Sequence, residues 1–184
     1  NGLRATDLMQ GPVYGHCSDA ARGDEALFPH FHYDDLFGTV VNRFAAQAAT
    51  GVPLTVYGNG NQRRGYLDLD DTLQCIALVA DAPPAPGKLR VFNQFTEIFS
   101  VRELAERVRD VGRRLGLDVS IRAIDNPRRE RDEHYYRPAH DGLTRLGFAP
   151  RRLGDDRLAA MIEFVRRHRD AIDTARIMPR VSWA

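Results

Sequence analysis

Two short stretches in which apolar and polar residues alternate lie close together in the first half of the chain. They are Leu54–Tyr57 and Gly65–Leu69, and the turn-forming sequence GNGNQ separates them. This pattern predicts a β-hairpin or two neighbouring strands. Asp70 or Asp71 then offers a side-chain cap for the next helix, which the apolar spacing predicts over Asp71–Ala80.

The remaining apolar positions predict strands and helices in mixed order. Ser100 and Glu103 form a capping box at the start of one helix, and Gly51 provides the end of another. A long segment, His16–Tyr33, has no periodicity, and loops of that length are usually functional or disordered. The succession predicts an α/β fold with a mixed sheet. The predicted strands are Gly2–Leu8, Val13–Gly15, Leu89–Phe92 and Val119–Ile124, and the other predicted helices are Leu36–Thr50 (capped by Asp34 or Asp35), Val101–Leu115, Asp141–Leu146 and Asp155–Asp170, before an irregular tail Asp173–Ala184.

Composition limits the classes of function. The 184 residues are enough for one domain with a sizeable core, and a formal net charge of +1 gives no case for nucleic-acid or membrane binding. We see no apolar run long enough to span a bilayer and no signal peptide. Cys17 and Cys75 are expected to be free thiols, which is typical of a reducing, cytosolic compartment. Because Asn1 is not methionine and a core strand follows almost at once, we expect an N-terminal part of the protein to be missing.

Arg64 is the first candidate for binding chemistry. It stands beside Tyr66 at the start of the second alternating stretch, and an arginine on a rigid strand suits a phosphate because its planar fork donates two parallel hydrogen bonds. Arg128, in the loop after the last predicted strand, is a candidate second arginine for a diphosphate. Each has a simpler interpretation, Arg64 as a solvated surface residue and Arg128 as part of the charged surface sequence RRER.

Two motifs of nucleotide-dependent dehydrogenases are not found in the sequence. Gly58 and Gly60 are followed by Arg63 where a dinucleotide fingerprint has its third glycine, and no helix opens there. Lys88 is the only lysine, and Pro84 lies four residues before it. The Tyr-x-x-x-Lys pair that supplies acid/base catalysis in short-chain dehydrogenases therefore cannot form, and we expect no catalytic residue in this chain.

Two groups of potential metal ligands have simpler interpretations. Two histidines alternate in the sequence HFH, and a histidine and a cysteine precede them, but no second pair has zinc-like spacing. Three aspartates near residue 70 could bind a divalent cation, although a strand running into a helix cap explains them more simply. We predict no metal site at His16, Cys17, His30, His32, Asp68, Asp70 or Asp71.

Seven longer stretches run in register over nearly the whole chain and carry a family resemblance. They are RATDLMQGPVYG (Arg4–Gly15), FGTVVNRF (Phe37–Phe44), PLTVYGNGNQRRGYLDLDDTLQC (Pro53–Cys75), RVFNQFTEIFSV (Arg90–Val101), NPR (Asn126–Arg128), EHYY (Glu133–Tyr136) and IMPRVSW (Ile177–Trp183). Together they resemble the C-terminal half of the extended short-chain dehydrogenase/reductases, most closely the UDP-sulfoquinovose synthases. Met9 departs from the family pattern, which has asparagine there, and the loop His16–His32 shares little of its sequence.

The resemblance implies a fold, a reaction and partners. The fold would be the C-terminal part of a Rossmann-type enzyme, with remnants of the Rossmann sheet interleaved with a small nucleotide-sugar-binding domain over residues 1–184, while the NAD-binding half would be absent. NAD⁺ would oxidise C4 of UDP-glucose, water would be lost across C5 and C6, sulfite would add at C6, and NADH would return the hydride. The full-length enzyme would be a homodimer in the cytoplasm, or in the plastid stroma of a photosynthetic eukaryote.

The resemblance also implies roles for residues of this chain. Gln10 would contact the hexose or the sulfite, and Val13 would lie against the nicotinamide end of NAD. The free backbone N–H groups at a helix start would face the UDP, and an extended segment would bind uracil through backbone groups. The helix start comprises Phe37, Gly38, Thr39 and Val40, the uracil segment comprises Val52, Pro53 and Leu54, and the diphosphate would be bound by Arg64, beside Tyr66, and by Arg128.

Two other interpretations stay open. Because Met9 replaces the family's asparagine, the parent could be another NAD-dependent nucleotide-sugar epimerase or dehydratase, which would consume UDP-glucose without sulfite. A non-catalytic arginine-rich module that binds RNA would instead show strong, salt-dependent affinity for nucleic acid. The near-neutral charge argues against the second interpretation.

Overall fold

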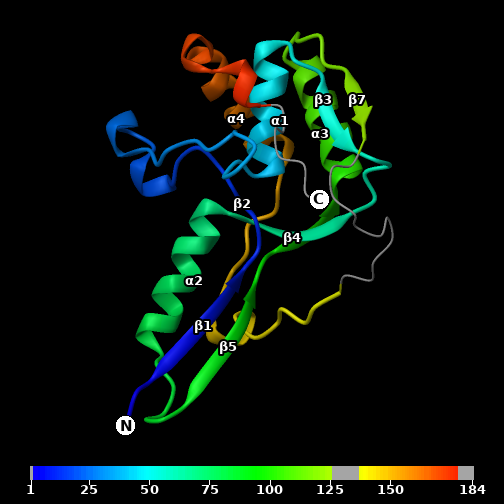
Figure 1. The fold of residues 1–184 in the computed structure, drawn as a ribbon. Coiled ribbons are helices and arrows are strands. Elements are labelled where there is room, and N and C mark those ends of the chain that lie inside the picture. The colour runs from blue at the N-terminus through cyan, green and yellow to red at the C-terminus, as the bar shows by residue number, and fades with distance from the viewer. Residues whose placement is uncertain (1, 126–136, 178–184) are drawn as a thin grey trace.

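The computed structural model describes residues 2–125 and 137–177, which form helices packed against three small sheets (Figure 1). All strand pairs are parallel except β4–β6, and the sheet orders are β1–β5, β2–β4–β6 and β3–β7. This arrangement confirms the predicted α/β class. The strands are β1 (Ala5–Gln10), β2 (Val13–Tyr14), β3 (Leu54–Tyr57), β4 (Arg63–Asp68), β5 (Leu89–Gln94), β6 (Glu97–Ser100) and β7 (Ile121–Ile124), the helices are α1 (Val40–Thr50), α2 (Leu69–Asp81), α3 (Val101–Arg114) and α4 (Asp155–Arg167), and short 3₁₀ turns cover Asp19–Ala21, Glu25–Leu27, Thr144–Leu146, Arg169–Ala171 and Thr174–Arg176.

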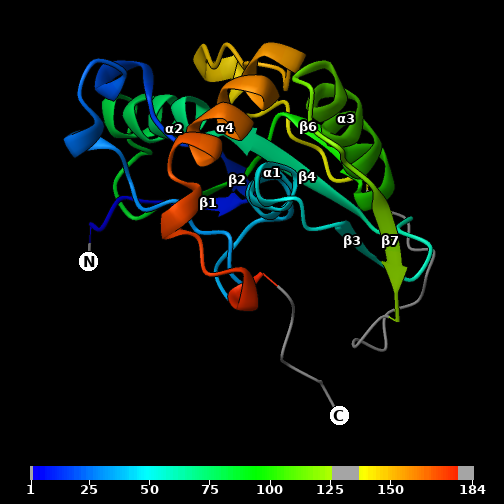
Figure 2. The same ribbon diagram turned by 90° about the horizontal axis from the view of Figure 1, so that it is seen from above.

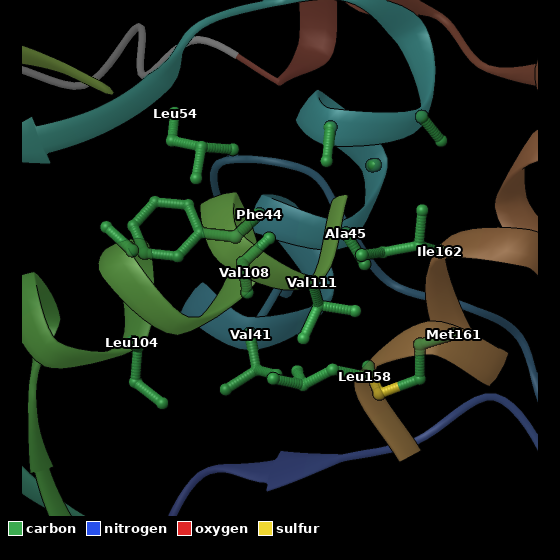
Figure 3. Packing of buried hydrophobic residues seen from close by; sticks show 14 of the residues in the cluster. Val41, Phe44, Ala45, Leu54, Leu104, Val108, Val111, Leu158, Met161 and Ile162 are labelled. Carbon is green, nitrogen blue, oxygen red and sulfur yellow. The ribbon is translucent and has the colours of Figure 1, made fainter. Parts of the chain in front are cut away.

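Helix α1 lies at the centre of the main hydrophobic core. Seen along its axis, it is surrounded by α3, α4 and the strands β3 and β4 (Figure 2). Every residue from 41 to 49 is buried, and a helix that is buried on all sides must be covered by several elements. Phe44 packs among Leu54, Leu104 and Val108, while Ala45 faces Ile162 of α4 (Figure 3). Small alanine side chains along α1 let these neighbours approach closely.

Helix α1 begins at Val40 rather than at the predicted Leu36. Asp34 does not cap it, because the Asp34 Oδ1 atom accepts hydrogen bonds from the N–H groups of Leu36 and Phe37, both at 2.8 Å, and closes a separate turn. The chain then passes so close to this turn at Gly38 that a Cβ atom there would lie 2.3 Å from the carbonyl oxygen of Asp34. The predicted start was wrong because the local turn competes with the helix.

The ends of the other helices test predictions that were made from neighbouring residues in the sequence. The capping box of Ser100 and Glu103 is present in both directions, and Gly51 adopts a left-handed φ of 74° at the end of α1, so both predictions are confirmed. The predicted cap of α2 was wrong: Asp68, not Asp70 or Asp71, is the N-cap, and its side chain accepts a hydrogen bond from the Asp70 N–H. The helix accordingly starts earlier than predicted.

The two alternating stretches form strands but do not pair with each other. Strand β3 pairs with β7, and β4 lies between β2 and β6. The predicted hairpin or pair of neighbouring strands is therefore wrong, and β6, just before the helix that starts at Val101, was not predicted. β4 also starts at Arg63, so that Arg64 lies inside a strand and pairs with Phe99 of β6.

The β1–β5 sheet has one covered face and one open face. Helix α2 runs along the sheet (Figure 1). Leu8 and Phe92 pack against a buried cluster that contains Cys75. On the alternate positions, Met9 and Val91 are 57% and 49% exposed. In a doubly wound α/β fold both faces of a parallel sheet are covered, so this open face is unusual for a parallel pair. No helix among residues 2–125 and 137–177 is long and apolar enough to cross a membrane.

We expect the isolated chain to self-associate through this open face. Exposed apolar strands favour pairing and stacking with other copies. Val91→Lys, which places a positive charge across the strand pair from Asp7, should restore a monomer. Sedimentation velocity of the two proteins over a concentration series measures the effect. The matched control is Leu27→Lys, at an exposed apolar residue elsewhere. The expectation is wrong if the unmodified chain is already monomeric, or if only the control variant is monomeric.

Candidate nucleotide-sugar site

Arg64 is held in a defined position by its strand. Its backbone pairs with Phe99 of β6, and its Nη1 atom donates a hydrogen bond to the carbonyl oxygen of Arg63 at 2.8 Å. Arg63 points elsewhere and is bound by Glu103 at 3.2 Å and by the carbonyl oxygen of Ile98 at 3.3 Å. Of the two neighbouring arginines, Arg63 therefore has a structural role, and a contact of Arg64 with an anionic ligand stays a prediction.

The start of α1 offers hydrogen-bond donors that no acidic residue neutralises. Its first turn carries no Asp or Glu, and its N-cap, Thr39, makes no side-chain capping bond. The Thr39 Oγ1 atom is buried without a hydrogen-bond partner in the described part of the chain. Because the first N–H groups of a helix are unpaired and carry partial positive charge, an anion is favoured there. Phe37 and Gly38 lie in the turn before the helix, and their N–H groups already donate to Asp34 at 2.8 and 3.1 Å, so the predicted free N–H groups at these two residues were wrong.

The extended segment after α1 has already used its backbone donors. The Val52 N–H donates to the carbonyl oxygen of Gln47 at 3.0 Å, the Leu54 N–H donates to the carbonyl oxygen of Ser120 at 2.8 Å, and Pro53 has no N–H. A uracil bound here would therefore be recognised through carbonyl oxygens that accept its N–H. The eleven residues of α1 separate this segment from the helix start by about 16 Å, so a ligand that contacts both would lie alongside the helix.

Gln10 is fixed at the carboxyl end of the β1–β5 sheet. It pairs with Gln94, and its Nε2 atom donates to Thr72 Oγ1 at 3.3 Å. The Gln94 Nε2 atom in turn donates to the carbonyl oxygen of Thr72 at 3.4 Å. Ligands of open α/β sheets bind outside the carboxyl ends of the strands, so Gln10 occupies a suitable position. Sequence reasoning missed Thr72, because nothing local links residues 62 positions apart.

Val13 lies between Gln10 and the start of α1. It is half-buried in β2, where it pairs with Leu67 of β4. Two residues later, the Gly15 N–H donates to Asn42 Oδ1 in the first turn of α1 at 3.3 Å. The structure thus brings the segment that contains Gln10 and Val13 next to the start of α1.

The remaining predicted residues are placed differently. Tyr66 is 2% exposed and packs in the main core with its ring centroid 6.2 Å from that of Phe99. The Leu54 side chain is likewise buried, so only the backbone of Leu54 could contact a ligand. Contacts of Tyr66 with a substrate stay a prediction, and they would require its ring to become accessible. Arg128 lies outside the described residues.

Burial shifts the pKa values of three titratable groups near this region. Burial, with a smaller effect of Asp68, raises the pKa of Tyr14 far above its ordinary value. Burial also raises the pKa of Cys75 to about 11 and raises the pKa of Asp71. Tyr14 and Cys75 are therefore neither a base nor a nucleophile near neutral pH. The described part of the chain also contains no group of three side chains able to hold a metal ion.

A buried ion pair that the sequence did not indicate joins three parts of the fold. Asp68 is 3% exposed at the end of β4, and its carboxylate accepts hydrogen bonds from Arg157 Nε at 2.7 Å and Nη2 at 3.0 Å. Arg157 belongs to α4, and its Nη2 atom also donates to the carbonyl oxygen of Cys17 at 3.0 Å. The pair thus fixes β4 and the long loop after β2 to α4.

Comparison with known proteins identifies the family. Residues 27–93 match the model of the NAD dependent epimerase/dehydratase family. The chloroplastic UDP-sulfoquinovose synthase of Spinacia oleracea is 50% identical over 182 residues, which cover 99% of this chain and 38% of that protein. The UDP-sulfoquinovose synthase of Sulfolobus acidocaldarius is 42% identical over 184 residues, which cover 99% of this chain and 47% of that protein.

A solved structure supports the same fold. A UDP-glucose 4-epimerase from Thermotoga maritima, determined with UDP-glucose, matches 91% of this chain and 47% of its own chain with a TM-score of 0.67 at 20% identity. Residues 27–93 of the chain therefore match the NAD dependent epimerase/dehydratase family, and the fold is that of the Rossmann-type enzymes. The chain is similar to the UDP-sulfoquinovose synthases, which confirms the resemblance found in the sequence. It spans less than half the length of either curated relative.

Proposed function

We propose that this chain is the nucleotide-sugar-binding portion of an NAD-dependent UDP-sulfoquinovose synthase, which converts UDP-glucose and sulfite to UDP-sulfoquinovose. The observation that carries the proposal is the 50% and 42% identity to two enzymes of that name over 99% of the chain. The cytoplasm, or the plastid stroma as in the chloroplastic relative from spinach, is the proposed location of the full-length protein. We propose a homodimer as its assembly.

The proposed substrate contacts follow the geometry of the described residues. Arg64 would bind the diphosphate from a fixed strand position, and the free donors at the start of α1, together with the Thr39 hydroxyl, would bind phosphate oxygens. Carbonyl oxygens of residues 52–54 would accept the uracil N–H, because the N–H groups of that segment are already paired. Gln10 would meet the hexose or the sulfite. Arg128 would complete the diphosphate contacts.

The proposed cofactor site lies only partly in this chain. NAD supplies the hydride acceptor and donor of the reaction when it is bound. The half-exposed apolar Val13, held against β4, fits a contact with the nicotinamide end. The catalytic tyrosine and lysine would come from the rest of the parent enzyme, since Lys88 is the only lysine here. We therefore expect this chain alone to be inactive.

Arg64→Ala in the full-length enzyme is expected to weaken UDP-glucose binding by about 10- to 100-fold, because it removes charge-assisted hydrogen bonds worth about 1.5–3 kcal/mol. Isothermal titration of UDP-glucose measures the effect. Arg63→Ala is the matched control, as that neighbouring arginine is already bound by Glu103. Unchanged affinity in the Arg64 variant, or an equal loss in the control, would contradict the proposed diphosphate contact.

A second candidate is another NAD-dependent nucleotide-sugar epimerase or dehydratase. It is favoured by Met9, which replaces the family's asparagine next to Gln10 at the carboxyl end of β1. The two candidates differ in their need for sulfite. Turnover of UDP-glucose by the full-length enzyme that needs no sulfite would support the second candidate and overturn the first.

A further inference from the structure

A cavity of about 520 Å³ lies between the long loop after β2 and helix α4. Its walls include His16, Arg22 and Phe28 from the loop and Arg157, Ala160 and Arg167 from the helix. The volume falls in the range of small-molecule binding sites. None of the residues assigned above to the nucleotide-sugar site lines it.

His16 lines this cavity and has a buried polar atom without a hydrogen-bond partner among the described residues. The residue is 8% exposed, and its ring stacks on Phe164 with the centroids 4.8 Å apart while meeting the edge of Phe28 at 5.8 Å. Its Nδ1 atom has no hydrogen-bond partner in the described part of the chain. Buried polar groups are nearly always paired with protein, water or ligand. A ligand in the cavity is one way to provide that partner.

Three guanidinium groups line the same cavity and retain unused donors. Arg22 is bound by Asp19 through Nη2 alone, and Arg167 is bound by Glu25 through Nη2 at 3.1 Å. Arg157 uses Nε and Nη2 for its bonds, and its Nη1 atom has no partner within residues 2–125 and 137–177. Because each guanidinium has five N–H donors in a planar fork, each can still bind an oxyanion.

The lining residues include as many arginines as carboxylates, but the charges that act on His16 are positive on balance. Burial and the positive charges of Arg157, Arg167 and Arg22 lower the pKa of His16 to about 4, against the smaller opposite effect of Glu25. Three carboxylates also line the cavity. Two of them are already held by arginines, Glu25 by Arg167 and Glu163 by Arg166 at 3.1 Å, so that only Asp156 lacks a cationic partner among residues 2–125 and 137–177.

We propose that this cavity binds the sulfate-like or phosphate-like oxyanion group of a small molecule, at a site separate from that of the nucleotide diphosphate. Arg22 and Arg167 would hold the oxyanion from opposite walls, and the neutral His16 ring would provide a hydrogen bond beside it. The two sites share strand β4 but not their residues. Asp68, which anchors Arg157, lies about 13 Å along the strand from Arg64, with the buried Tyr66 between them.

The test is a titration of this chain with inorganic sulfate and, separately, inorganic phosphate, followed by the NMR signals of the His16 ring. Sodium chloride at matched ionic strength is the salt control, because both anions stabilise proteins generally. We expect saturable shifts at His16 and none at the exposed His30. The double variant Arg22→Gln/Arg167→Gln should weaken binding at least about tenfold, as two charged donors are lost. Arg145→Gln, at an exposed arginine whose partner Asp141 does not line the cavity, should not.

Three outcomes would overturn the proposal. They are shifts that never saturate, the same shifts with chloride, and unchanged binding in the double variant. A competition titration with UDP tests whether the two sites are separate. Displacement of sulfate by UDP would mean that the cavity is part of the nucleotide site and would also overturn the proposal. If the double variant does not fold, the titration of the wild-type chain at His16 and the competition with UDP still test the proposal. This inference does not depend on the proposed synthase activity, because the titration needs neither NAD nor turnover.

Discussion

Replacing Arg157 with alanine is expected to lower the free energy of unfolding of this chain by about 3–5 kcal/mol. The carboxylate of Asp68 is almost fully buried and also caps α2, so losing its partner leaves an uncompensated charge. The substitution also removes the bond to the carbonyl oxygen of Cys17, which fixes the long loop to α4. Urea denaturation followed by circular dichroism measures the change.

Two further variants make this prediction specific. Arg166→Ala, on the same helix, removes an exposed pair with Glu163 and should change stability by less than about 1 kcal/mol. Asp68→Asn combined with Arg157→Met should recover part of the loss, because the buried charge is then gone. Equal effects of Arg157→Ala and Arg166→Ala would show that the Asp68 pair contributes no more than a surface contact.

The chain is also expected to lose about 3 kcal/mol of stability as the pH falls from about 6.5 to about 4. Burial and three arginines lower the pKa of His16 in the folded protein to about 4, from an ordinary value of 6.5. In that window the unfolded chain binds a proton at this residue and the folded chain does not, so acid favours unfolding. Asp71 acts in the opposite sense, because its raised pKa lets the folded state take up a proton first as the pH falls.

His16→Phe isolates the histidine contribution. A phenyl ring can replace the imidazole in its stack on Phe164 without binding a proton. Urea midpoints measured at pH 7, 6, 5 and 4 should fall for the unmodified chain and stay nearly level for this variant. His30→Gln is the control, at an exposed ring. If His16→Phe loses stability with acid as steeply as the unmodified chain, another group is responsible.

The sequence predicted the features that depend on neighbouring residues. The capping box of Ser100 and Glu103 and the left-handed Gly51 each involve residues within one helical turn, and both are present. The start of α1 was wrong because two local signals compete there, and Asp34 closes its own turn before the helix. Such competition is decided by a few tenths of a kcal/mol per residue, which propensities do not resolve.

Features that depend on distant residues could not be predicted. The turn-rich sequence GNGNQ indicated a hairpin. In a parallel pair such as β3–β7, however, no short turn connects the two strands, so the local sequence gives no signal that they pair. In the candidate site, Arg64 was predicted from its own chemistry and Gln10 from the family resemblance alone, and both roles stay predictions. Thr72, which holds Gln10, and Arg157, which holds Asp68, lie 62 and 89 residues from their partners. Only the folded arrangement connects them.

The parallel strand pairs also determine when this chain can fold as it is synthesised. Ala5 in β1 must wait for Leu89 in β5, and Leu54 in β3 must wait for Ile121 in β7. At roughly 5–20 residues per second, β1 spends about 4–17 s outside the ribosome without its partner. Pairings between distant residues also form slowly once both are available. During those seconds β1 is an unpaired strand that can associate with other chains. Ribosome-bound chaperones that cover short apolar segments would protect the nascent chain from aggregation at this stage.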